Sequence, residues 1–445
     1  MRKLTSPRRH LRMIALAAGA VLALAGCSAG SLGSSGGGGG GDGVSLTFLV
    51  GSNQSTVNAA ESLSKAFTAQ NPGITINVET RPQGSEGDNI VKTRLATGDM
   101  PELFLYNSGS LFQAIGPEQN LVPLTDQPWV GALEENYKRV VTAGSEVYGA
   151  PFGSQLTGAV LYNKKVYTDL GLQVPRTWDE FMANNAAVKA AGVVPVIQTY
   201  GDTYTSQLFV LGDFHNVAAA EPDFADRYTA GQAKFATSPA ALKGWQHLQE
   251  LHDLGYYNED FPTAKMEEGM RKLGAGEGVH YPMLTNGIST LAVASPEGAK
   301  DIGIFPLPGD DPAKNGLTVW SPSGVYIPKT TEGAKLDAAK KFEAFLASPA
   351  GCDAQSAGST PTGPYAVDGC TLPADVLPAT QDFQSYVDAG TYSPALEFLS
   401  PIKGPALEQI TVEVGSGIRP AADGAALYDQ DVRKQALQLG LPGWD

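Results

Sequence analysis

Strand-like and helix-like segments alternate from Val44 to Tyr106, and this alternation constrains the fold more than any other feature of the sequence. Residues 44–50 are a short, β-branched apolar run, and residues 74–78 alternate apolar with polar side chains as a half-buried strand does. The segment between them carries apolar side chains at helical spacing, at Val57, Ala60, Leu63 and Phe67. A helical pattern at 90–96 and a strand-like run at 102–106 follow. This repetition predicts an α/β layer on a largely parallel sheet.

The middle and the end of the chain continue the mixed pattern. A capping box at Thr177 to Glu180 and the Ser238-Pro239 pair each predict the start of a helix. Further strand-like runs lie at 193–199, 302–305 and 325–328, and a helical pattern covers 334–347. A chain of 445 residues with this content is expected to form two domains rather than one.

The first 43 residues are expected to be an export signal followed by a flexible tether. A basic stretch is followed by an apolar run, residues 13–25, that is too short to span a bilayer and has the length of a signal-peptide core. The quartet Leu24 to Cys27 resembles the bacterial lipobox, which implies a signal peptide at 1–26 and a lipidated Cys27. Simple cleavage and secretion is the alternative. Residues 27–43 are nearly all Gly and Ser and are expected to be a flexible tether.

Charge and cysteines narrow the possible partners. The chain has 31 Lys and Arg against 46 Asp and Glu, a formal charge of −15, which argues against nucleic acid or an anionic membrane surface as the main partner. Cys352 and Cys370 lie in a loop-rich stretch, and in an oxidising compartment they are expected to form a disulfide. Two unpaired buried thiols are the alternative. No metal or other cofactor is expected, because two thiols without nearby histidines do not complete a zinc site.

Several sequence blocks, in order, closely resemble the extracellular solute-binding protein family 1, the sugar-type receptors of ABC importers. The blocks are Gly98–Leu103, Val147–Phe152 with Leu161–Lys165, Gly171–Phe181 with its Thr-Trp-Asp-Glu-Phe run, Phe305–Pro308 and Ala339–Leu346. The sequence departs from the family pattern before residue 325, where Trp320 is kept without the usual two glycines, and in 275–287, where a tryptophan is missing.

The resemblance implies a two-lobed, periplasmic-binding-protein-like α/β fold, type II-like, with a ligand cleft between lobes joined by crossover segments. We expect the first lobe at 44–151 and about 275–330, and the second at about 152–274 and 331–445. It further implies capture of a mono- or oligosaccharide by hinge closure and delivery to a membrane permease. The protein is then an exported, lipid-anchored receptor on the outer face of the bacterial cytoplasmic membrane, and a monomer.

A sugar cleft needs flat aromatic rings for the apolar sugar faces and amides or carboxylates for the hydroxyls. Trp320 matches the stacking tryptophan of the family and is expected on a loop. Most other candidates follow predicted strands, because ligands on such sheets bind beyond the strand ends; Gln155 lies where the chain is expected to cross between lobes, and Asn286 lies in the stretch compared with the family pattern. The other candidates are Tyr200, Asp202, Tyr204, Asn53, Gln54, Asn107, Gln155 and Asn286. The tryptophans at 129, 178, 245 and 444 are expected to pack in the core.

Two other classes of function remain open from the sequence. A secreted glycosidase would need paired carboxylates, which 46 acidic residues supply by number alone, but the sequence contains no metalloprotease, phosphate-loop or nucleophile-elbow motif in a credible context. A binding protein for a peptide or polyamine would use aromatic and acidic side chains, and Tyr200, Asp202 and Tyr204 are compatible with such a ligand.

Overall fold

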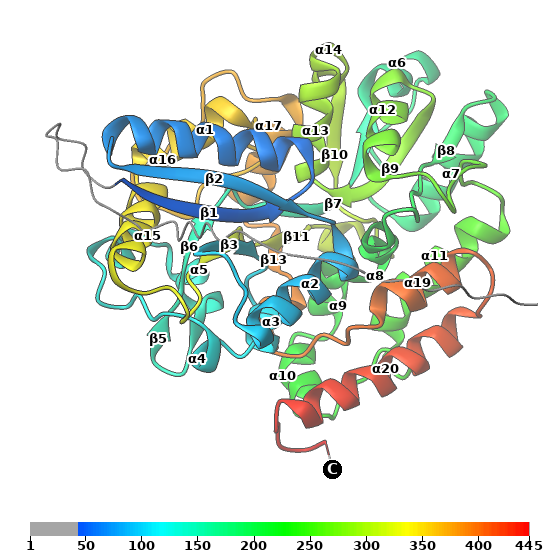
Figure 1. The fold of residues 1–445 in the computed structure, drawn as a ribbon. Coiled ribbons are helices and arrows are strands. Elements are labelled where there is room, and N and C mark those ends of the chain that lie inside the picture. The colour runs from blue at the N-terminus through cyan, green and yellow to red at the C-terminus, as the bar shows by residue number, and fades with distance from the viewer. Residues whose placement is uncertain (1–42, 445) are drawn as a thin grey trace, which may run out of the picture. The chain divides into compact units, whose positions relative to one another are not determined.

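The structure, a computed structural model, describes residues 43–444 and shows two large β-sheets, each covered by helices (Figure 1), and a small two-stranded sheet of β4 (Thr142–Ala143) and β5 (Glu146–Val147). The predicted signal peptide, the lipidation at Cys27 and the tether up to residue 42 lie outside the described residues. None of the helices in 43–444 is long and apolar enough to cross a membrane.

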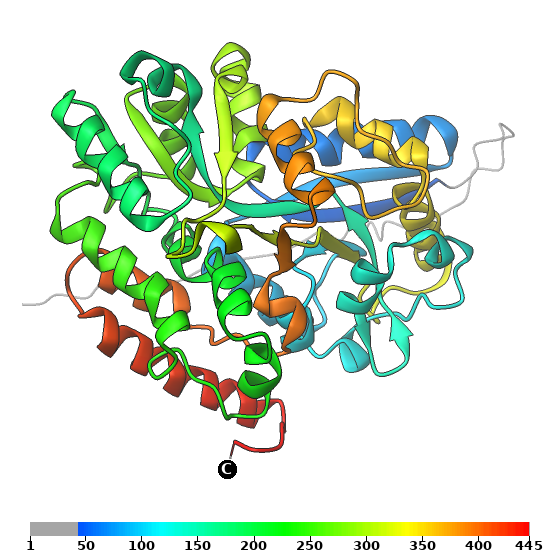
Figure 2. The same ribbon diagram turned by 180° about the vertical axis from the view of Figure 1, so that it is seen from behind.

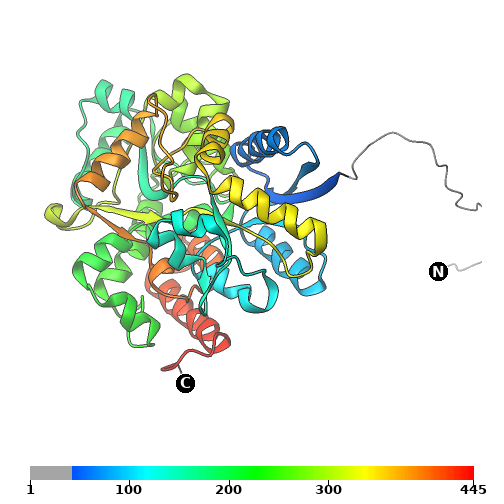
Figure 3. The same ribbon diagram turned by 90° about the vertical axis from the view of Figure 1, so that its left-hand side faces the viewer.

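The first lobe is built on a five-stranded sheet in the order β2-β1-β3-β12-β6. Its strands are β1 (Val44–Gly51), β2 (Ile74–Arg81), β3 (Leu103–Tyr106), β6 (Gly149–Phe152) and β12 (Ser323–Tyr326). β1 is parallel to β2 and β3, whereas β12 is antiparallel to both of its neighbours. Helix α1 (Gln54–Gln70) and helix α15 (Gly333–Leu346) pack on β1 (Figure 3). There Phe342 makes edge contacts with Phe48 and Phe67 at ring distances of 5.6 and 5.2 Å.

The second lobe is built on a sheet in the order β13-β11-β7-β9-β8, with β10 paired beside β7. Its strands are β7 (Leu156–Asn163), β8 (Val194–Val196), β9 (Gly278–Leu284), β10 (Ile302–Phe305), β11 (Leu317–Trp320) and β13 (Tyr392–Pro394). The C-terminal helix α20 (Ala421–Gln438) packs along α11 (Pro239–Asp253) and α19 (Leu407–Gly415) (Figure 2). The tryptophans at 129, 178, 245 and 444 are buried in the cores, as predicted.

The chain passes between the lobes more than once, and this corrects the predicted lobe boundaries. The crossing at about residue 152 lies between β6 and β7, close to the predicted boundary. In contrast, β9, β10 and β11 were expected in the first lobe. Each of them pairs with β7 and therefore belongs to the second sheet. Helix α15 and helix α16 (Pro349–Gly358), which were expected in the second lobe, belong to the first core. The physical reason is that an apolar strand pattern does not specify the sheet that the strand joins.

Local predictions of helices and strands are confirmed. Helix α1 begins after Asn53, whose side chain accepts hydrogen bonds from the backbone of Ser55 and Thr56, and the strands at 44–51 and 74–81 flank it. Helix α7 (Trp178–Ala190) begins at the predicted capping box, where the Thr177 hydroxyl accepts from the Glu180 N–H at 3.3 Å. The Ser238 hydroxyl caps α11 in the same way.

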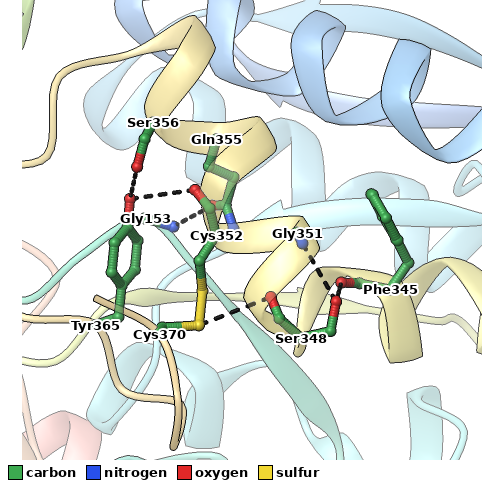
Figure 4. The surroundings of a disulfide bond; sticks show 9 residues. All are labelled: Gly153, Phe345, Ser348, Gly351, Cys352, Gln355, Ser356, Tyr365 and Cys370. Carbon is green, nitrogen blue, oxygen red and sulfur yellow. Dashed lines mark hydrogen bonds between the residues drawn. A yellow bond between two sulfur atoms is a disulfide. The ribbon is translucent and has the colours of Figure 1, made fainter. Parts of the chain in front are cut away.

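A disulfide joins Cys352, on α16, to Cys370 in the loop that follows (Figure 4). Tyr365 lies beside it, with its hydroxyl 2.6 Å from that of Ser356, and bonds the Cys352 carbonyl. On the same helix, the side chain of Gln355 accepts from the N–H of Gly153 at 2.7 Å. The disulfide therefore fixes a loop of the first lobe beside the segment where the chain leaves that lobe.

Candidate functional site

A cavity of about 230 Å³ lies between the two lobes, and residues of both lobes line it. The first lobe contributes the ends of β2 and β3 and the beginning of α2 (Gly84–Thr97). The second lobe contributes the end of β11, the 3-10 turn η2 (Thr203–Gln207) and the C-terminal segment 397–408. The charged lining residues are Arg81, Asp88, Glu397, Lys403 and Glu408, and the uncharged polar ones are Thr56, Gln83, Tyr106, Asn107, Tyr204, Gln207, Asn286, Trp320 and Ser323.

Two further chambers adjoin this cavity, because each shares lining residues with it. One, of about 130 Å³, shares Leu156 and Asn286 and is otherwise lined largely by hydroxyls and backbone of 153–154 and 359–362. The other, of about 300 Å³, shares Asp88, Lys403 and Glu408. The cleft is therefore elongated, with one chamber rich in hydroxyls and another rich in charge.

Trp320 is held at the cleft by a chain of polar contacts. It is the last residue of β11, not part of a loop as predicted, and its side chain is 7 % exposed. Its indole N–H donates a hydrogen bond to one carboxylate oxygen of Glu397, and the other oxygen lies 3.3 Å from Nζ of Lys403. A Cβ at Gly158, on β7, would lie 2.7 Å from the indole ring, so glycine is required there for the tryptophan to lie against the sheet.

Four polar atoms of residues that line the cavity are buried and have no hydrogen-bond partner among the described residues. They are Nε of Arg81 and the hydroxyl of Tyr106 on the first lobe, and Oε1 of Gln207 and Oδ1 of Asn286 on the second. A buried polar atom left unpaired costs about 1–3 kcal/mol. Such atoms are the natural partners of a ligand that carries both donors and acceptors and that touches both lobes.

The other contacts of Arg81 explain why its Nε donor has no hydrogen-bond partner. Its two terminal nitrogens donate to the carbonyls of Pro82 and Leu105 at 3.2 and 3.3 Å, and its guanidinium lies 5.9 Å from the Tyr106 ring centre. These contacts occupy the end of the guanidinium and leave Nε free. Burial lowers the pKa of Arg81, while neighbouring Asp88 opposes that change.

The charges of the cleft nearly balance one another. Burial raises the pKa of Asp88, and Arg81, Lys92 and Lys403 act against that shift. Glu408 accepts a hydrogen bond from the Thr203 hydroxyl at 2.7 Å. The central cavity thus has three acidic and two basic side chains, several already paired, and suits a neutral polar ligand better than a multiply charged one.

Four of the residues predicted from the sequence line the cavity, namely Trp320, Tyr204, Asn107 and Asn286. Asn107 follows β3 and is exposed at the cleft, while Asn286 is the first residue of α13 (Asn286–Ala294). Tyr204 lies in the turn η2. Asn107 and Asn286 reach the cavity just beyond the ends of β3 and β9, as ligand sites on such sheets do, whereas Trp320 ends a strand and Tyr204 lies in a turn.

Tyr200 and Asp202 line neither the cavity nor its adjoining chambers, which corrects their prediction. The Tyr200 ring is buried against Phe261 at a ring distance of 5.3 Å. The carboxylate of Asp202 accepts the Met266 N–H at 2.8 Å and so caps helix α12 (Met266–Ala275). The turn that follows β8 packs on residues 261–266, and the chain reaches the cleft only at Tyr204.

Asn53, Gln54 and Gln155 also lie outside the cavity lining. Besides capping α1, Asn53 donates through Nδ2 to the Thr290 hydroxyl at 3.0 Å, which joins the two lobes directly. Gln54 is exposed and donates to the Asn58 side chain. Gln155 donates to Glu134 at 2.9 Å, because along this extended segment its neighbours 154 and 156 face the cleft instead.

Metal coordination is not part of this site. Within residues 43–444, no three His, Cys, Asp or Glu side chains are grouped so that they could hold a metal ion. The groups present in the cleft are hydrogen-bond donors, acceptors and aromatic rings, which are the components of a binding site for a small polar molecule.

The fold and the cleft together define a two-lobed solute-binding protein. Known structures share this fold. A chitin oligosaccharide binding protein matches with a TM-score of 0.76 at 22% identity, covering 89% of this chain and 100% of that one. A raffinose complex of the solute-binding protein RafE matches with a TM-score of 0.71 at 19% identity, covering 89% and 99%.

The family follows from the sequence comparison. The model of the bacterial extracellular solute-binding protein family matches residues 52–351, and the chain belongs to this family. The multiple sugar-binding protein of Streptococcus mutans is 24% identical over 63% of this chain, and the match spans just under two thirds, 66%, of that relative. The melibiose/raffinose/stachyose-binding protein MelE of Bacillus subtilis is 25% identical over 83% of each chain.

Proposed function

We propose that this protein is the sugar receptor of an ABC importer, binding a mono- or oligosaccharide in the cleft and delivering it to a membrane permease. The observation that carries the proposal is the set of four unpaired polar atoms, two from each lobe, around one cavity that also contains Trp320. A sugar hydroxyl both donates and accepts and can pair with all of them. Because they lie on both lobes, the ligand stabilises the form in which the lobes are closed.

The chemistry of the cleft supports a sugar ligand. The indole of Trp320 provides a flat apolar surface for a sugar ring, and the amides of Asn107, Gln207 and Asn286 suit hydroxyl groups. The adjoining chambers leave room for more than one ring. The relatives named above bind sugars according to their names, which agrees with this interpretation.

The test is thermal unfolding of the purified protein with mono- and oligosaccharides, peptides and polyamines. A ligand at 100 times its dissociation constant is expected to stabilise the fold by about 2.7 kcal/mol, which raises Tm by a few degrees. A shift with one group of sugars supports the proposal. A shift with a peptide or polyamine alone would contradict the ligand class, and turnover of a sugar would indicate an enzyme.

Asn286→Ala is expected to weaken sugar binding about tenfold without lowering Tm. Its side chain has no hydrogen-bond partner among the described residues and so contributes no bond to folding, but a sugar hydroxyl can pair with its free oxygen. Isothermal titration and thermal unfolding of the same sample test both parts. Gln70→Ala, an exposed amide at the end of α1 outside the cavity lining, is the control and should change neither quantity. An unchanged dissociation constant in Asn286→Ala would exclude this contact.

Glu397 is proposed as a positioning residue for Trp320. Glu397→Ala removes the acceptor of the indole N–H and is expected to raise the sugar dissociation constant about tenfold, whereas Glu397→Gln keeps an acceptor and should recover most of the affinity. Glu413→Ala, which breaks a surface ion pair with Arg419 in the same lobe, is the matched control and should leave affinity unchanged. Equal losses in the Ala and Gln variants would show that the indole bond is not the cause.

We further propose that Cys27 is lipidated and holds the protein on the outer face of the cytoplasmic membrane, where it reaches its permease as a monomer. The lipobox-like Leu24 to Cys27 and the Gly/Ser run support this proposal. In cells fed labelled palmitate, the protein is expected to carry label and sediment with membranes. Cys27→Ser should lose both properties, while the disulfide variant Cys370→Ser should keep the label. Unlabelled wild-type protein in the medium would favour simple secretion.

A further inference from the structure

The second lobe contains a separate cavity of about 270 Å³, which shares no lining residue with the cleft or its adjoining chambers. It lies between α9 (Phe214–Ala220), α11 and the loop 309–314, on elements visible in Figure 1. Sugar binding in the cleft does not use this cavity. The polar groups that line it therefore raise the separate question of which ligand they would bind.

Buried hydrogen-bond acceptors line part of the second cavity, beside apolar side chains and the amines of Lys243 and Lys314. Asp213 is 2 % exposed, and its Oδ1 accepts from Nδ2 of Asn216 at 2.7 Å. The same Nδ2 donates to the carbonyl of Leu307 at 3.0 Å, so both amide hydrogens of Asn216 are in use. What Asn216 can still offer a ligand is its carbonyl oxygen, and what Asp213 can offer is its second carboxylate oxygen.

His247 adds a third acceptor. Its side chain is 6 % exposed, lines the cavity, and has no hydrogen-bond partner for either ring nitrogen among the described residues. The ring stacks on Trp178 with centroids 3.6 Å apart, which fixes its plane. Burial, with the charge of Lys243 in addition, lowers the pKa of His247 to about 3, so the ring is neutral and one nitrogen carries a free lone pair.

We propose that this cavity binds the primary ammonium group of a small organic amine, with Asp213, Asn216 and His247 accepting its three N–H bonds. Ala220, Pro239 and Ala240, which line the same cavity, would cover a short alkyl chain. Lys243 does not occupy the acceptors, because its Nζ lies 3.1 Å from a carboxylate oxygen of Asp310. A bare metal ion is a poorer fit, since no group of three metal-binding side chains exists within residues 43–444.

The charged groups that line the cavity nearly balance, with Asp310 and Asp311 against Lys243 and Lys314, so the buried carboxylate of Asp213 is the group with which a cationic ligand would pair. Burial raises the pKa of Asp213 to about 7; the Asn216 hydrogen bond and Lys243 lower it, and Asp310 raises it. The other titratable groups that line the cavity are His247, Asp311 and Lys314. An ammonium ion beside Asp213 favours the carboxylate, so binding releases to solvent the proton that Asp213 holds. The measured heat should then depend on the ionisation enthalpy of the buffer.

Isothermal titration of the whole protein with propylamine hydrochloride at pH 7 tests the site. We expect one molecule bound per chain, with at least about tenfold weaker binding in Asp213→Asn, the size of loss typical of a missing charged hydrogen-bond partner. Ala240→Phe, which fills the cavity without removing a polar group, should also lose binding and guards against a folding defect. Asp226→Asn, an exposed carboxylate of the same lobe outside the cavity, is the matched control.

The outcomes separate this site from the cleft. Propylamine binding that persists in Trp320→Ala and disappears in Asp213→Asn supports the second site, whatever the sugar experiments show. Absence of binding, equal binding to wild type and Asp213→Asn, or loss of binding in Trp320→Ala alone would overturn it.

Discussion

Trp320→Ala is expected to raise the dissociation constant of the bound sugar about 100-fold, a loss of about 2.7 kcal/mol that is typical of a buried aromatic residue at the centre of an interface. The indole lies at the end of β11, borders the central cavity and is fixed by Glu397 and, through it, by Lys403. Its removal takes away the flat surface for the sugar ring and leaves a buried carboxylate without its donor. Isothermal titration against the sugar found in the thermal screen measures the change.

Two variants separate stacking from simple loss of packing. Trp129 is buried to a similar extent, 8 % exposed against 7 % for Trp320, but belongs to the first core and lines no part of the cleft. Trp129→Ala should therefore reduce the free energy of unfolding and leave the sugar affinity of the folded protein unchanged. Trp320→Phe keeps an aromatic face and should retain much of the affinity. Equal affinity losses in Trp129→Ala and Trp320→Ala would contradict a stacking role.

The extent to which sequence predicts this fold depends on the range of the interaction. The helix starts predicted at Thr177 and Ser238 are observed, because each is set by a hydroxyl that bonds a backbone N–H three residues away. The start of α1 after Asn53 uses the same kind of cap but lies in a segment that was predicted as a loop. Whether β9, β10, β11 and α15 belong to the first or the second lobe depends on their contacts with segments more than a hundred residues away in the sequence. The apolar face of a strand or helix does not specify which other segment it packs against. For this reason the predicted lobe assignment of these elements was wrong.

The residues of the candidate site also divide into those that local sequence signals identified and those that depend on distant contacts. Asn107 was found because it directly follows a strand of the first sheet. Arg81 and Tyr106 were missed because they are the last residues of strands and look like ordinary strand positions. Glu397 and Lys403 were missed because they reach the cleft from the C-terminal segment, and the only sequence signal was an acidic and a basic residue in a loop-rich region.

One buried residue of the first lobe lies outside the cleft lining and is expected to contribute to the pH dependence of stability. Glu343 lies on α15, is fully buried, and neither carboxylate oxygen has a hydrogen-bond partner among residues 43–444. Burial raises its pKa well above the usual 4.5, although Lys340 acts in the opposite direction. The hydroxyl of Tyr137 is also buried without a partner, and the charge of Glu343 is among the causes that raise the pKa of that tyrosine. Burial without a partner therefore favours the protonated form of Glu343 in the folded protein.

Glu343→Gln is expected to make the protein progressively more stable than wild type as the pH rises. The folded wild type keeps a proton that the unfolded chain releases above pH 4.5, so its stability is greatest below that value and falls as the pH rises towards the folded pKa. The difference in unfolding free energy between variant and wild type should widen by up to about 1.4 kcal/mol per pH unit from pH 4.5 up to the folded-state pKa. Denaturant unfolding at four pH values measures it.

In the comparison with wild type, the contributions of all other titrating groups to the pH dependence cancel, because those groups are the same in both proteins. Glu61→Gln, an exposed position on α1 of the same lobe, should run parallel to wild type at all pH values. A Glu343→Gln curve that also runs parallel to wild type would mean that Glu343 is ionised in the folded protein, and then a partner must be sought for its charge. A widening difference would instead identify Glu343 as a buried acid that lowers the stability of the protein as the pH rises.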